Sequence, residues 1–214
     1  MKKILILIIL ISPLFVFGQS KGDYFLTLNY GFVLDENHPD LDIDSHSPDM
    51  YTGYNDKDDA KNSIKISASY HLTDNMLFGV SYMNSEIEGS NDIEIWNGEF
   101  TEFNLFAELE IFEKNDFGVY AKGGLGSVNF DAFRNLVFDG GQVPLNSYSG
   151  TSSKILYGAG ATYQISTRFK LNLEITRNIV NHDGFEGWDY GSGEDRFLYQ
   201  SIGISYYIQR KESE

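Results

Sequence analysis

The acidic side chains that could bind a metal ion are most concentrated between residues 35 and 61. Asp40, Asp42 and Asp44 have the alternate spacing with which an EF-hand calcium loop begins. That loop needs Gly at its sixth position and Glu at its twelfth, where this chain has Ser45 and Tyr51. The segment is therefore either a solvated acidic loop or a loose divalent-cation site, and we predict no defined metal centre. The candidate cation ligands are Asp40, Asp42, Asp44, Asp56, Asp58 and Asp59.

Residues for nucleophilic or acid–base catalysis are scarce, because the sequence has no cysteine and only four histidines. His182, Asp183 and Ser192 are the residue types of a hydrolytic triad, but nearness in sequence does not create that geometry. A lipid-modifying enzyme that uses His182 stays open as an alternative. We predict that the chain is not an enzyme and that it needs no cofactor. The lack of cysteine also excludes disulfides and thiolate metal sites.

A third set of charged residues alternates with apolar residues, and a period of two residues indicates β-strands. On such strands these charges share one face, and Glu108 can lie opposite Lys122 across a tight turn near Asn115. Charges enclosed in a narrow barrel are costly unless they are paired, so we predict an ion-pair network that fills the lumen. A gate that opens a small pore is the functional alternative. The predicted lumen network is Lys65, Glu102, Glu108, Glu110, Lys122, Lys170 and Glu174.

The alternating pattern occurs in eight stretches of the chain. Each can be extended to the ~9–11 residues that a tilted membrane-spanning strand requires. Several have glycine on the polar face, which would ease packing inside a narrow barrel. The stretches are 24–32, 64–72, 76–82, 103–111, 117–125, 155–163, 169–175 and 198–206.

The connections between these stretches are alternately short and long. Residues 73–75, 113–116 and 166–168 have the length of tight hairpin turns. Short turns on one side and long loops on the other are typical of barrels in the bacterial outer membrane. We therefore predict an all-β fold, an eight-stranded antiparallel up-and-down transmembrane β-barrel. The long connections are expected at roughly 35–61, 87–99, 131–152 and 180–195.

Aromatic residues on the apolar faces recur at two levels, as expected for the two membrane interfaces. A soluble lipocalin-like barrel is the alternative, with its apolar face turned inward around a small ligand. The two levels favour the membrane-spanning form, with the apolar face outward. They comprise Tyr24, Tyr70, Phe78, Phe117, Tyr163, Phe169 and Tyr206 at the short-turn end, and Tyr30, Phe32, Tyr82, Phe103 and Tyr157 at the other.

The N-terminus has the pattern of a secretory signal, because two lysines precede an apolar run over 4–17 and a small Gly18. The net charge of −15 argues against nucleic-acid binding, which needs clusters of Lys and Arg. The predicted organisation is a cleaved signal peptide over 1–18, a barrel over 19–208 and a polar tail over 209–214.

The chain resembles the small outer-membrane β-barrel superfamily of the OmpA-like transmembrane domain, OmpX and Ail type. The resemblance covers the mature chain and rests on paired strands such as 70–80 and 163–171, on the glycine-rich segment 119–126 and on the closing Tyr206-Tyr207-Ile208. The tail after Ile208 departs from such barrels, which often end on an aromatic residue.

We predict a monomer in the bacterial outer membrane with a structural or surface-interaction role. Its expected partners are membrane lipid, lipopolysaccharide and an extracellular molecule bound by the loops. A narrow channel or a carrier of small solutes through the charged lumen is the alternative function. The loop aromatics expected to contact a partner are Trp96, Phe185, Trp188 and Tyr190.

Overall fold

The computed structural model describes residues 23–35, 57–59, 61–73, 75–90, 94–138, 141–181 and 195–208. The predicted signal peptide over 1–18 and the tail over 209–214 lie outside these residues. Within the described residues, no helix is long and apolar enough to cross a membrane.

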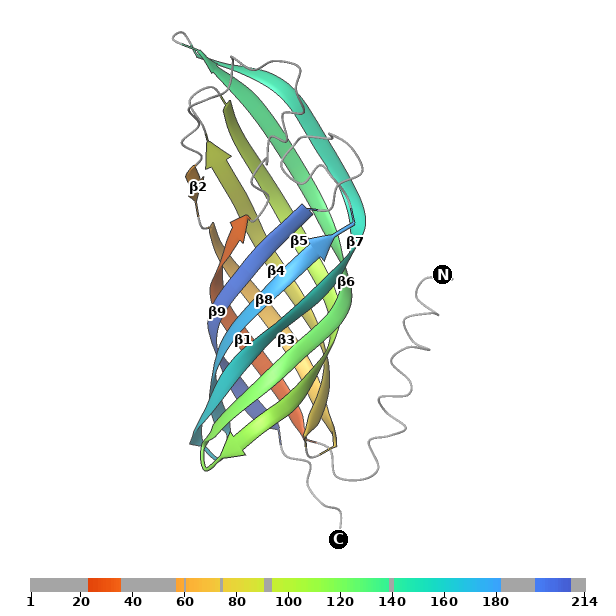
Figure 1. Cartoon of the computed structure of the whole chain (residues 1–214), viewed down its shortest axis with the longest axis vertical. Helices are drawn as coiled ribbons and strands as arrows, with labels where there is room; N and C mark the ends of the chain where they lie inside the picture. Colours follow the sequence, from red (N-terminus) through yellow and green to blue (C-terminus); the bar gives the residue numbers. More distant parts are fainter. Residues whose placement is uncertain are drawn as a thin grey trace, which may run out of the picture.

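The described chain forms one antiparallel β-sheet that closes on itself (Figure 1). Eight long strands pair in the order β1-β3-β4-β5-β6-β7-β8-β9, and β9 pairs back with β1. The three-residue β2 pairs only with the end of β4. The predicted eight-stranded barrel is confirmed. The strands are β1 (Tyr24–Asp35), β2 (Lys57–Asp59), β3 (Lys61–Thr73), β4 (Met76–Ser90), β5 (Glu94–Lys114), β6 (Phe117–Phe138), β7 (Gly141–Ser166), β8 (Phe169–Val180) and β9 (Asp195–Ile208).

The apolar face of the barrel points outward and the polar face points inward. Leu28 and Ile66, which are cross-strand partners, are both 55% exposed. By contrast, Lys65 is 4% and Glu174 is 5% exposed in the interior. The lipocalin-like alternative is therefore wrong, because that fold would enclose its apolar face. An outer surface of this kind is suited to contact with lipid acyl chains.

Aromatic residues pair across strands at the short-turn end of the outer face. The Tyr24 and Tyr70 rings have centroids 5.1 Å apart, and the Phe169 and Tyr206 rings have centroids 5.3 Å apart. Both pairs are directly opposed in the strand register, where aromatic contacts add to sheet stability.

Each of the three short turns has a β-bulge in the strand that precedes it. The register shifts at Leu72, Ile111 and Ile165, and these aliphatic side chains are exposed. The turn after β5 contains Asn115 with a φ of 55°, a left-handed conformation that asparagine tolerates well. Each bulge therefore adds one outward apolar side chain at the short-turn rim.

Two of the four expected long loops are strands instead. The β4–β5 hairpin continues to Ser90 and Glu94, and the β6–β7 hairpin continues to Phe138 and Gly141. Trp96, expected in a loop, lies within β5. The prediction failed because the alternation reverses along these extensions. Outward residues such as Glu99 and Asp131 are polar there, while Phe100 and Phe130 are apolar and buried.

These extensions form a sheet that projects past the ends of β8 and β9 (Figure 1). We call it the protruding sheet. It consists of residues 84–90 of β4, 94–101 of β5, 129–138 of β6 and 141–152 of β7, with β2 paired to β4.

Candidate functional site in the barrel interior

A chain of four alternating charges crosses the middle of the barrel interior, and we call it the lower tier. Lys122 Nζ lies 2.7 Å from Glu174 Oε2 and 3.0 Å from Glu108 Oε1. Lys65 Nζ contacts the other carboxylate oxygen, Oε1, of Glu174. The four residues come from β3, β5, β6 and β8, so the tier ties strands together across the lumen.

The strand register explains part of this geometry. Glu108 and Lys122 are direct cross-strand partners in the β5–β6 hairpin. Glu174 lies opposite Gly160 on β7, and a Cβ at Gly160 would collide with the Tyr120 ring. The absence of that side chain lets Tyr120 lie across β7, with its hydroxyl 3.4 Å from Glu174 Oε2. Here the predicted packing role of inward-facing glycine is confirmed.

The lysines of the lower tier also lie over aromatic rings. Lys122 Nζ is 3.9 Å from the centroid of the Phe106 ring, and Lys65 Nζ is 4.2 Å from that of Tyr199. A desolvated cation over a ring gains roughly 2 kcal/mol or more. The rings therefore offset part of the cost of burying these charges.

A second group of charges, the upper tier, links β5, β7 and β8. Lys154 Nζ lies 2.6 Å from Glu102 Oε2 and donates a 2.6 Å hydrogen bond to Asn178 Oδ1. Asn104 Nδ2 donates to the same Glu102 oxygen at 3.2 Å. Sequence reasoning missed Lys154, which directly precedes the expected sixth strand. Lys154 lies four residues before the inward-facing Gly158, so the two-residue period of the strand places its side chain on the same inward face. That spacing could have identified it.

An apolar cluster fills the barrel interior at the end opposite the short turns. The Phe100 and Phe197 rings have centroids 5.3 Å apart within it. Sequence analysis did not predict this cluster, because most of its residues lie in or beside stretches expected to be loops. We call this cluster the apolar plug. It comprises Val33, Met83, Phe100, Val128, Phe130, Ala132, Val180, Phe197 and Tyr199.

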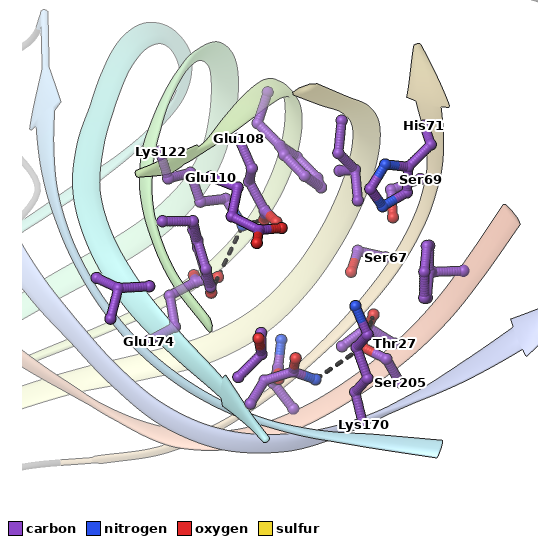
Figure 2. Close-up of a pocket in the computed structure, with 18 of the residues that line it drawn as sticks. Thr27, Ser67, Ser69, His71, Glu108, Glu110, Lys122, Lys170, Glu174 and Ser205 are labelled. Atoms are coloured by element: carbon purple, nitrogen blue, oxygen red, sulfur yellow. Dashed lines mark hydrogen bonds and ion pairs between the residues drawn. The ribbon is translucent and has the colours of Figure 1, made fainter. Parts of the chain in front are cut away.

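A polar cavity of about 70 Å³, the vestibule, lies on the short-turn side of the lower tier (Figure 2). Ser67, Ser69 and His71 line one wall, while Glu108 and Glu110 lie across from them (Figure 2). Between the two tiers the space falls to about 10 Å³, which is close to the size of a single water molecule. The interior is therefore open toward the short turns and narrow above the lower tier.

The seven predicted lumen residues are distributed over the lower tier, the upper tier and the vestibule. Five of them form the two tiers, where Glu108 and Lys122 face each other as expected from the turn. Glu110 and Lys170 instead line the vestibule, with Lys170 Nζ 5.3 Å from the centroid of the Phe25 ring. The functional role of these residues stays a prediction.

The predicted loop sites lie largely outside the described residues. Of the acidic candidates, only Asp58 and Asp59 fall on a described strand, where they pair with Gly89 and Glu88 in the backbone register. Within the described part of the chain, no three Asp, Glu, His or Cys side chains are placed to bind a metal ion. Outside it lie Asp40, Asp42, Asp44, Asp56, His182, Phe185, Trp188 and Tyr190.

Comparison with known proteins agrees with this architecture. The model of the family described as "outer membrane protein beta-barrel domain" matches residues 7–206. The chain belongs to this family. As members are outer-membrane proteins, the protein is a β-barrel of the bacterial outer membrane. A comparison with curated proteins finds no match.

Solved structures of other outer-membrane barrels are similar in fold. Neisserial surface protein A matches with a TM-score of 0.53 at 12% identity, covering 87% of this chain and 99% of its own. OprG from Pseudomonas aeruginosa matches with a TM-score of 0.52 at 12% identity, covering 91% of this chain and 99% of its own. At such identities the likeness supports the fold alone. The prediction that the chain is not an enzyme stays a prediction.

Proposed function

We propose that this outer-membrane barrel is closed to solutes and has a structural or surface-interaction role. The observation that carries the proposal is the filled interior, in which two ion-paired tiers and the apolar plug lie in series. Eight strands enclose a space about wide enough for side chains alone. A permeating ion would have to break the ion pairs of both tiers and would also have to pass the apolar plug.

The energetics of the lower tier favour a closed state. Removing one partner of a buried ion pair costs roughly 3–5 kcal/mol, because the other charge is left uncompensated. The side chains of Lys65, Lys122 and Glu174 are only 4–5% exposed, so bulk water cannot replace their partners. Thermal opening of the tier is therefore rare, and a steady pore is not expected.

The surface beyond the membrane is the part of the molecule that remains available for interaction. The protruding sheet extends from the plugged end, opposite the three short turns, and this end faces the cell exterior in barrels of this kind. Function in rigid scaffolds is commonly carried by such segments. Lipopolysaccharide, membrane lipid and an extracellular partner are the proposed contacts of this monomeric barrel.

Solute flux into liposomes tests the closed state. Protein refolded into liposomes should give no swelling above protein-free vesicles with a small uncharged sugar, while a general porin serves as the positive control. A heat-dependent shift in gel mobility would establish that the barrel is folded in the same vesicles. Swelling that scales with the amount of folded protein would contradict the proposal.

A narrow channel is the second candidate, because the vestibule reaches the lower tier from the short-turn side. Glu108 lies at this boundary with its side chain 19% exposed. If the tier is a gate, Glu108→Gln should raise the ionic conductance several-fold. Unchanged conductance in folded Glu108→Gln and Lys122→Met variants would remove this candidate.

A further inference from the structure

The vestibule contains two opposite charges that do not form an ion pair. Lys170 lies on β8 and Glu110 on β5, and both side chains line the cavity (Figure 2). Among the residues that the structure describes, no carboxylate lies within ion-pair distance of Lys170, whose Nζ lies 5.3 Å from the centroid of the Phe25 ring. Glu110 likewise has no lysine or arginine partner in the described part of the chain. All the charges of the two tiers are paired, so these two distinguish the vestibule from the rest of the lumen.

The negative side of the vestibule consists of two carboxyl groups. Glu113 lies beside Glu110 and repels it, while Lys170 attracts Glu110 from across the cavity. The β-bulge in β5 explains this placement, because Ile111 and Phe112 both point outward and Glu113 therefore returns to the side of Glu110. The vestibule thus has a negative pole of two carboxyl groups and a positive pole of one ammonium group.

Hydroxyl groups form a wall between the two poles. Starting from Lys170, this wall passes over Ser205 on β9, Thr27 on β1, and Ser67 and Ser69 on β3 (Figure 2). A hydroxyl group can donate a hydrogen bond as well as accept one. The wall can therefore hydrogen-bond to a polar molecule in either sense.

The inner end of the vestibule contains a polar atom that lacks a partner. Asn29 lines the cavity, is opposite Lys65 of the lower tier in the strand register, and is only 3% exposed. Its Oδ1 has no hydrogen-bond partner among the described residues. A buried acceptor without a partner is destabilising. A donor group on a bound molecule would satisfy it.

We propose that the vestibule binds a small zwitterion of the amino-acid type, whose ammonium group lies at Glu110 and whose carboxylate lies at Lys170. The cavity of about 70 Å³ has room for roughly five water molecules, which a ligand of this size would replace. The ligand enters from the short-turn side, which faces the periplasm in barrels of this kind. Since the lower tier closes the inner end, the site is compatible with a barrel closed to solutes and adds a binding role to it.

Ligands with only one kind of charge are poorer occupants. A simple cation that contacts Glu110 would be repelled by Lys170, and a simple anion at Lys170 would be repelled by Glu110 and Glu113. A neutral sugar would hydrogen-bond to the wall and would leave both charges without a partner. A zwitterion pairs with both poles at once and adds no net charge to the lumen.

Calorimetric titration of the full mature protein, folded in a nonionic detergent, tests the proposal. The probes are the unbranched amino acids from glycine to 6-aminohexanoate, in which the distance between ammonium and carboxylate rises stepwise. The controls are the alkylamine and the carboxylic acid of the same chain length, each of which has one of the two charges. We expect one length to bind at least tenfold more tightly than both of its single-charge controls.

Matched variants locate the site on the protein. Lys170→Met should reduce the affinity for the best amino acid to that for the corresponding alkylamine, whereas Lys114→Met, on an exposed turn residue that does not line the cavity, should leave it within twofold. Glu110→Gln should likewise weaken binding at least fivefold, with Asp116→Asn on the same turn as its control. Folding of each variant is checked by its heat-dependent gel mobility.

Three results would overturn the proposal. Equal binding of an amino acid and its alkylamine at every length would mean that the carboxylate finds no partner. Equal effects of Lys170→Met and Lys114→Met would place the ligand outside the vestibule. Binding that appears only after removal of residues 209–214 would mean that this segment occupies the vestibule in the full chain. None of these results bears on solute flux, so a failure here is distinguishable from a failure of the closed-barrel proposal.

Discussion

Replacement of Glu174 by glutamine should be the most destabilising single change in the lower tier. Glu174 contacts both Lys65 and Lys122, and its side chain is 4% exposed. Glutamine keeps the volume but removes the charge. Lys122 would retain Glu108 at 3.0 Å, whereas Lys65 would lose the carboxylate with which it pairs among the described residues.

The expected magnitude follows from this difference between the two lysines. One uncompensated buried charge lowers the free energy of unfolding by about 3–5 kcal/mol. Glu108→Gln is the matched control, since Lys122 would still contact Glu174 and the Glu108 side chain is 19% exposed. We expect the control to cost about 1 kcal/mol, the scale of an ordinary hydrogen bond.

The assay is reversible urea unfolding in lipid vesicles, followed by tryptophan fluorescence. Adding Lys65→Met to Glu174→Gln should restore much of the lost stability, because the double variant no longer buries an unpaired ammonium group. Equal losses for Glu174→Gln and Glu108→Gln, or no recovery in the double variant, would refute the reasoning.

Three further changes test the packing of the interior and the outer face. Gly160→Leu should lower stability by about 1–3 kcal/mol through its collision with Tyr120, whereas Gly123→Leu, which has open space around it, should be tolerated in the same unfolding assay. Phe197→Ala should cost about 3–5 kcal/mol by leaving a cavity in the apolar plug, measured by the same urea titration. Leu105→Arg on the lipid-facing surface should cost about 2–4 kcal/mol in vesicles if it lies near the bilayer midplane.

The barrel itself was predictable because lipid imposes a strict alternation on every strand that crosses it. Leu28 and Ile66 face lipid while Lys65 faces the lumen, and a period of two residues makes this visible in the sequence. Farther along the strands the outward residues are polar, as at Asp131, while the inner face carries the buried Phe130 and Ala132 of the apolar plug. The apolar-outward alternation is lost there, which is why the outer halves of β6 and β7 were assigned to a loop.

Ion pairs in the barrel interior could be predicted only between residues that lie close together in the sequence. Glu108 and Lys122 belong to one hairpin, so the turn determines their pairing. Lys65 and Glu174 are 109 residues apart in sequence and meet across the lumen. Their meeting depends on the stagger of all eight strands, which alternation alone does not reveal.

Planar-bilayer recording of the folded wild-type protein is the most direct test of the closed interior. With the two tiers and the apolar plug in place, we predict no steady ionic current at moderate voltage in concentrated potassium chloride. A persistent open-state conductance in wild type, abolished when the same sample is unfolded by heat, would contradict the account.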